Sequence, residues 1–132
     1  MTQLLNAGRL LRRLLLNSEE LRTDSRGVWP VIVPEGTELP YVCYRRKNSE
    51  TVRAVAAGCE VTFDVMIFDA DYTHGATLAE AAVAELSEYP RSFDPVHVEL
   101  ARNIRHIEIV DSSEGWAGDS YYQLLTVKFR IA

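Results

Sequence analysis

The sequence is poor in cysteine, since Cys43 and Cys59 are the two examples among 132 residues. Two thiols cannot build a disulfide framework, and a structural zinc site needs four ligands at close spacing. The sequence therefore predicts neither a disulfide framework nor a structural zinc site. The low cysteine content is typical of a protein in a reducing compartment. We expect both cysteines to be structural, as small apolar groups on strands.

Long apolar runs are also missing, because the leucine-rich start of the chain is interrupted at Arg9, Arg12 and Arg13. No stretch approaches the ~20 apolar residues that span a bilayer, so no membrane partner is expected. Basic residues are in the minority, with 14 Lys and Arg against 19 Asp and Glu and a net charge of −5. This balance argues against a general affinity for phosphate backbones, and no specific nucleic-acid partner is expected.

The sequence lacks two motifs that mark common catalytic and nucleotide sites. No serine lies in a Gly-x-Ser-x-Gly elbow, and no glycine-rich loop matches a phosphate cradle. Hydrolase and nucleotide-binding functions are therefore unsupported, and no catalytic or cofactor-binding residue and no cofactor is predicted.

The composition is that of a globular domain. Hydrophobic residues make up 47% of the chain and charged residues 25%, values close to the average for soluble proteins. A chain of this length has room for one compact core, so residues 1–132 are expected to form a single domain.

The spacing of apolar residues predicts the order of the elements. A helical period at the start and a second one in the middle of the chain indicate two main helices, while runs of period two indicate strands. Residues 47–57 have no clear period, and residues 111–118 are predicted to form the loop of a closing hairpin. The predicted helices are 2–17 and 72–88, the predicted strands are 28–34, 40–46, 59–67, 103–110 and 119–131, and a turn of helix is possible after Pro95.

Strands separated by a helix, without βα repetition, indicate an α+β domain. We expect a mainly antiparallel sheet of four to five strands, with two main helices packed on one face. Phe63 and Val65 of the central strand are expected to lie under the second helix. The inner stripe predicted for that helix is Ala76, Ala79, Val83 and Leu86.

The most enzyme-like cluster is formed by Asp69, Asp71 and His74, because two carboxylates and an imidazole at close spacing can bind a divalent metal. The same residues suit a strand-to-helix turn in which an acid caps the helix. We favour the capping interpretation and predict no metal site. His97 and His106 are expected to be at the surface or partly covered.

A basic patch consists of Arg45, Arg46, Lys47 and Arg53. It is a candidate interface with another subunit or partner, and the alternative is a solvated strand edge that discourages unwanted pairing.

An aromatic group of Trp116, Tyr121 and Tyr122 is predicted at the last hairpin. Exposed aromatic residues are typical of protein interfaces, so these three are also interface candidates. The alternative is that Trp116 is buried under its own sheet.

Three stretches together carry a resemblance to a known family: residues 28–30 followed by 35–44, the long strand that leads into Asp71-Tyr72 and 76–83, and the closing pair of strands. The sequence resembles the tail completion or tail terminator proteins of long-tailed phages, which join heads to tails, and their prophage-borne relatives. The resemblance extends from the first helix to Ile131. The hydrophobic first helix and the long connector 90–101 depart from the family pattern.

The resemblance implies a non-enzymatic virion assembly protein that caps the tail tube as a ring homo-oligomer, with a hexamer as one candidate. Its implied partners are further copies of itself, a tail tube protein and a head connector protein. Its implied locations are the cytoplasm of the bacterial host during assembly and the head–tail junction of the virion. Two other hypotheses remain: a small metal-dependent enzyme that uses Asp69, Asp71 and His74, or a host ligand-binding module.

Overall fold

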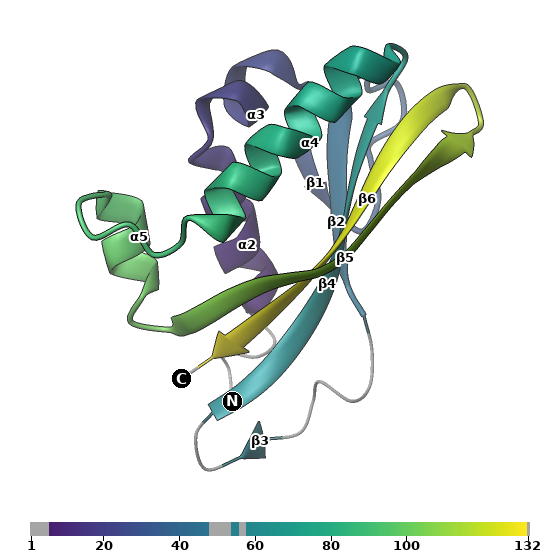
Figure 1. Cartoon of the computed structure of the whole chain (residues 1–132). Coiled ribbons are helices and arrows are strands. Elements are labelled where there is room, and N and C mark those ends of the chain that lie inside the picture. The colour runs from purple at the N-terminus through teal and green to yellow at the C-terminus, as the bar shows by residue number, and fades with distance from the viewer. Residues whose placement is uncertain (1–5, 48–53, 56–57, 132) are drawn as a thin grey trace.

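The computed structural model describes residues 6–47, 54–55 and 58–131. It is an α+β structure in which one mixed sheet carries the described helices on a single face (Figure 1). The helices are α2 (Ala7–Leu16), α3 (Glu19–Asp24), α4 (Tyr72–Ser87) and α5 (Pro95–Leu100). The strands are β1 (Val28–Pro30), β2 (Tyr41–Arg46), β3 (Ala54–Val55), β4 (Gly58–Asp69), β5 (Ile104–Ala117) and β6 (Ser120–Ile131).

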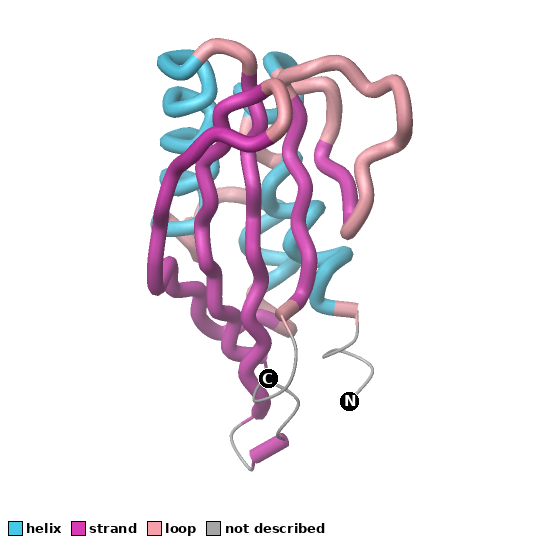
Figure 2. The backbone as a smooth tube through the Cα atoms, turned by 90° about the vertical axis from the view of Figure 1, so that its right-hand side faces the viewer, coloured by secondary structure: helices cyan, strands magenta, loops and turns pink. Residues whose placement is uncertain are grey.

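The strands follow the order β1-β2-β4-β6-β5, and β3 pairs with the start of β4. All pairs are antiparallel except β1 with β2, which run parallel. Figure 2 views the sheet from the side that the helices leave uncovered. The expected α+β class and the central place of β4 are confirmed, and the proline-containing strand β1 lies at an edge of the sheet.

The core lies between the sheet and the helices. Phe63 and Val65 of β4 are buried as predicted, because alternate residues of a strand face the same side. The ring of Phe63 contacts those of Tyr44 and Phe129 edge-on, with centroids 6.5 and 5.5 Å away. A Cβ on Gly8 of α2 would lie 3.8 Å from the Phe63 ring, so this phenylalanine packs beneath α2, whereas the prediction placed it under the second main helix.

The buried face of α4 differs in part from the predicted stripe. Ala79 and Leu86 are buried as expected, but Ala76 and Val83 are only half-buried. Leu78 and Ala82 are buried instead, so the inner face of α4 is rotated about the helix axis from the predicted stripe.

The helix α3 was not predicted, because residues 17–27 are mostly polar. Glu19 and Glu20 occupy its first turn, where acidic side chains interact favourably with the positive end of the helix dipole. Leu21 is its one buried residue, so a single apolar side chain leaves no periodic signal in the sequence.

The closing hairpin also differs from the prediction. Residues 111–117, expected to be a loop, continue β5 and pair with β6 up to Ala117. The connection is only Gly118–Asp119, and Gly118 has φ 64°, as a two-residue turn with glycine in first place requires. Polar side chains on residues 111–114 are exposed, so they are compatible with an edge strand whose backbone pairs with β6.

None of the described helices combines the length and the apolar character that crossing a membrane demands.

Candidate functional site

The turn between β4 and α4 brings together the three residues of the predicted metal cluster. The Oδ1 of Asp71 accepts hydrogen bonds from the backbone N–H groups of Thr73 (2.9 Å) and His74 (3.2 Å). Asp71 is therefore the N-cap of α4, and the capping interpretation is confirmed.

Asp69 and His74 form a close pair beneath this cap. The Oδ2 of Asp69 lies 2.5 Å from the Nδ1 of His74, and its Oδ1 accepts from the N–H of Asp71 at 2.9 Å. A Cβ on Gly75 would lie 3.0 Å from the Cβ of Asp69, so glycine permits this close approach. The carboxylates of the cluster are thus directed at the helix terminus and at the imidazole.

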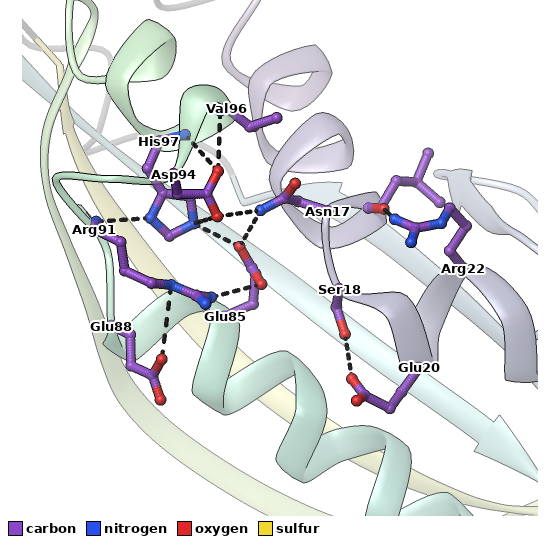
Figure 3. A network of polar contacts seen from close by, with 11 residues as sticks. Asn17, Ser18, Glu20, Arg22, Glu85, Glu88, Arg91, Asp94, Val96 and His97 are labelled. Atoms are coloured by element: carbon purple, nitrogen blue, oxygen red, sulfur yellow. Dashed lines mark hydrogen bonds and ion pairs between the residues drawn. The ribbon is translucent and has the colours of Figure 1, made fainter.

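A second polar cluster lies where α2, α4 and α5 meet (Figure 3). His97 is fully buried there, so the prediction of a surface or partly covered position is wrong. Its Nδ1 accepts from the N–H of Arg91 at 2.9 Å, which puts the ring proton on Nε2. The Nε2–H donates to the Oε2 of Glu85 at 2.5 Å. His106, in contrast, is exposed as expected.

The carboxylates of this cluster are held by several further donors. The Nδ2 of Asn17 donates to Glu85 and to Asp94, in both cases at 2.9 Å, and Arg91 Nη2 donates to the Oε1 of Glu85 at 2.9 Å. The other oxygen of Asp94 caps α5 by accepting from the N–H groups of Val96 and His97. Figure 3 shows these contacts converging from three helix ends.

Glu85, Asp94 and His97 have donor atoms within 4.8 Å of one another, a spacing that could hold a metal ion. Each of these carboxylate oxygens already accepts a hydrogen bond, and the Arg91 guanidinium already compensates the charge of Glu85. The cluster therefore works as a clamp between helices. Burial raises the pKa of Asp94, but hydrogen bonds from Asn17 and from the backbone outweigh burial, and the net pKa is lowered.

The sequence did contain one signal for this clamp. Asp94 precedes Pro95, and an acid followed by proline is typical of an N-cap and the first helical position. His97 follows three residues later, on the first turn of that helix. What the sequence could not reveal is that Glu85 and Asn17, from distant helices, meet this turn.

The aromatic residues of the closing hairpin lie on two different faces of the sheet. Trp116 is 58% exposed, so the alternative of burial under its own sheet is wrong. Its ring contacts Tyr121 edge-on at 4.8 Å, and Tyr121 contacts Tyr72 of α4 at 5.4 Å. Tyr122 points to the opposite face, because neighbouring strand residues alternate, and contacts Phe68 at 6.3 Å.

The hydroxyl of Tyr72 donates to Glu114 of β5 at 2.7 Å, and the amide of Gln123 donates to the same carboxylate at 3.0 Å. These hydrogen bonds lower the pKa of Glu114. Glu114 therefore carries a negative charge beside the group formed by Trp116, Tyr121 and Tyr72.

The basic residues lie at the other end of the sheet, where β2 ends. Arg45 Nε and Lys47 Nζ approach Asp64 at 4.0 and 3.6 Å, while Arg46 is exposed. Arg53, the fourth candidate, lies outside the described residues.

The two cysteines lie on strands β2 and β4, as expected. Burial raises the pKa of the Cys43 thiol, and the charge of Arg45 opposes this only in part. The thiol is thus protonated at neutral pH, and it donates to the carbonyl of Val31 at 3.4 Å. This setting supports a structural role for Cys43.

No protein-family model and no curated protein sequence matches the chain. A solved structure described as "Virion of native gene transfer agent (GTA) particle" contains a chain that superposes with a TM-score of 0.57. The match covers 98% of this chain and 90% of that chain, at 14% sequence identity. The two chains share a fold. The likeness to the virion chain spans the sheet and the helices alike, since it covers nearly all of the sequence.

Proposed function

We propose that this protein is a non-enzymatic structural subunit of a phage-like particle, which caps the tail tube and joins it to the head as a ring of identical single-domain copies. The observation that carries the proposal is the fold, which is similar over 98% of the chain to a chain of a gene transfer agent virion. The resemblance of the sequence to tail terminator proteins gives the finer role.

The chemistry of the polar clusters agrees with a structural role. The Asp69, Asp71 and His74 group caps a helix, and the Glu85, Asp94 and His97 group ties helix ends together. The hydrogen bonds described above for these side chains are with groups of the same fold.

The exposed surface offers contacts for other subunits. Trp116 and Tyr121 lie exposed near one edge strand, and Arg46 and Lys47 are exposed at the end of β2. Aromatic and arginine side chains are enriched where proteins bind one another. The partners that we propose are further copies of the chain, a tail tube protein and a head connector protein, met in the host cytoplasm and retained at the head–tail junction.

The test is deletion of this chain in cells that produce the particle, followed by electron microscopy. We expect complete heads that are separate from tails, and tails of abnormal length. Normal joined particles in the absence of the chain would overturn the proposal.

A second arm of the test uses charge reversal at the interface candidates Arg46→Glu, Lys47→Glu and Arg53→Glu. If all three variants support tails of normal length that join heads, the basic patch is not an interface. This conclusion holds even if the deletion confirms that the chain joins heads to tails. Trp116→Ala tests the aromatic group in the same assay.

A further inference from the structure

A strained turn ends the edge strand β1 and exposes two apolar side chains. The N–H of Ile32 donates to the carbonyl of Pro30 at 2.6 Å, which closes a three-residue turn around Val31. Val31 has φ 63° and is the one described non-glycine residue with positive φ, a conformation that costs a β-branched residue about 1 to 3 kcal/mol. Val31 and Ile32 are 68% and 74% exposed. We name this feature the Val31–Ile32 knob.

The knob is held in place and surrounded by positive charge. The N–H of Val31 donates to the carbonyl of Tyr44 at 2.7 Å, so the turn is fixed to β2. Val31 lines a shallow hollow together with Arg9, Arg45 and Arg46. Within the described part of the chain, no ion pair engages Arg9 or Arg46. The knob is thus an apolar projection with an arginine-rich rim.

The opposite edge of the sheet has a matching depression. A groove of about 380 Å³ runs between α4 and the β5–β6 hairpin. Its apolar walls include the half-buried residues that the predicted helix stripe had assigned to the core, and its rim carries two carboxylates. The apolar lining residues are Ala76, Ala79, Val83, Ile109 and Leu125, and the rim carboxylates are Glu80 and Glu114.

We propose that the groove binds the Val31–Ile32 knob of a second copy of this chain, an inference that rests on the ring proposed above. The knob and the lining of the groove are both largely apolar, and in this contact the arginines around the knob would lie opposite Glu80 and Glu114 at the groove. Charge complementarity of this kind selects the partner and fixes the orientation of an interface.

The arrangement of the sheet makes this contact head-to-tail. The knob belongs to the β1 edge and the groove to the β5 edge, which are the two ends of the strand order. Each copy therefore keeps one free knob or one free groove after pairing. Such heterologous contacts close into a ring when the rotation between copies permits.

Disulfide trapping tests this geometry in the full-length chain. One variant carries Ile32→Cys in the knob and a second carries Ser112→Cys in the groove wall. We expect a covalent dimer when the two variants are mixed under mild oxidation, and a ladder of higher species from the double variant. The unsubstituted chain, which retains Cys43 and Cys59, is the control for background cross-linking.

The outcomes separate the alternatives. Cross-linking of the Ile32→Cys variant with itself at the same rate as in the mixture would indicate a symmetric contact and overturn the proposal. The proposal also fails if the mixture forms no dimer beyond the control at the highest soluble concentration.

Sedimentation at increasing concentration provides a second measurement. We expect Ile32→Asp to weaken self-association at least about tenfold, while Phe93→Asp, at another highly exposed apolar position, leaves it unchanged. Arg46→Glu and Glu80→Lys should each weaken association, and their combination should restore it. Equal effects of Ile32→Asp and Phe93→Asp, or no restoration by the double charge reversal, would contradict the contact.

These results are independent of the deletion experiment. If deletion separates heads from tails but no knob-to-groove cross-link forms, the tail role stands and this interface falls. If the cross-link forms but the deletion has no effect on particles, the chain self-associates in a different context.

Discussion

The carboxylate of Asp69 and the imidazole of His74 lie 2.5 Å apart across the first turn of α4. The Asp69 side chain is buried, whereas 42% of the His74 side chain is exposed. The hydrogen bond that the His74 imidazole donates to Asp69 raises the pKa of His74 above its ordinary value, against a smaller opposing effect of desolvation. A folded-state pKa above the unfolded one means that the pair stabilises the protein mainly when His74 is protonated.

Asp69→Asn is expected to lower the pKa of His74 toward the ordinary value of about 6.5. In the parent chain the stabilisation by this pair is complete below about pH 6.5 and is lost as the pH rises through the raised pKa of folded His74. NMR titration of the imidazole measures the first effect, and urea unfolding at several pH values measures the second. An unchanged pKa in the variant would show that the hydrogen bond is not its cause.

His97→Ala is expected to destabilise the fold by about 3 kcal/mol, because it removes one donor from buried Glu85, removes the acceptor of the Arg91 N–H group and opens a cavity at the helix junction. Urea unfolding measures the loss. His106→Ala is the matched control, since His106 is exposed on β5 and its removal should change stability by less than about 0.5 kcal/mol. Equal effects of the two substitutions would contradict the clamp.

Asp94→Ala is expected to cost about 1 kcal/mol at neutral pH, through loss of the cap of α5. The pKa of Asp94 is lowered in the folded state, so its stabilisation is present above the unfolded value of about 3.9 and is lost as the pH falls through the folded value. Acid titration of the unfolding free energy should therefore be flatter below pH ~4 in the variant. If the unfolding free energy of the two proteins falls equally with pH in the acid range, Asp94 does not contribute to the acid dependence of stability.

Phe63→Ala is expected to cost about 3 to 5 kcal/mol, enough to unfold a marginal domain. The chain offers a close control in Phe93→Ala, because Phe63 is 1% exposed and Phe93 is 84% exposed. The same atoms are removed in both variants, so the difference in unfolding free energy measures burial alone. A Phe63→Ala variant as stable as Phe93→Ala would show that this strand face is wrongly assigned.

Val31→Gly should raise the unfolding free energy by about 1 kcal/mol, because glycine adopts positive φ without steric cost. The greater freedom of glycine in the unfolded chain offsets part of the gain. Thermal unfolding measures this change. The same variant removes half of the Val31–Ile32 knob, so it should be more stable and yet associate more weakly.

The sequence predicted those parts of the fold that have a strong local period. The alternation of β4 and the helical period at the start of the chain each placed apolar side chains on one face. Those faces are buried, and in the first helix Leu11 and Leu15 lie on the buried face. The helix α3 and the outer half of the hairpin escaped prediction because their residues are polar. Backbone pairing and one buried leucine determine those segments, and neither leaves a periodic pattern.

The candidate sites also differ in whether the local sequence could predict them. The cap at Asp71 could be predicted because an N-cap and its helix are adjacent in the sequence. The clamp around His97 could not, because Asn17 and Glu85 are brought to it by the tertiary fold, from 80 and 12 residues away along the chain. The exposed turn at Val31 was equally hidden, since a valine gives no local sign of positive φ.

The hairpin that continues its pairing to Ala117 also has a kinetic consequence. The backbone of this hairpin is already ordered by the pairing of β5 with β6. A molecule that docks beside α4 therefore does not have to order a loop, and little conformational entropy is lost on binding. Encounter then depends on diffusion and on the attraction between arginine and glutamate side chains, which salt screens. Growth of an assembly from such rigid parts is therefore fastest at low ionic strength.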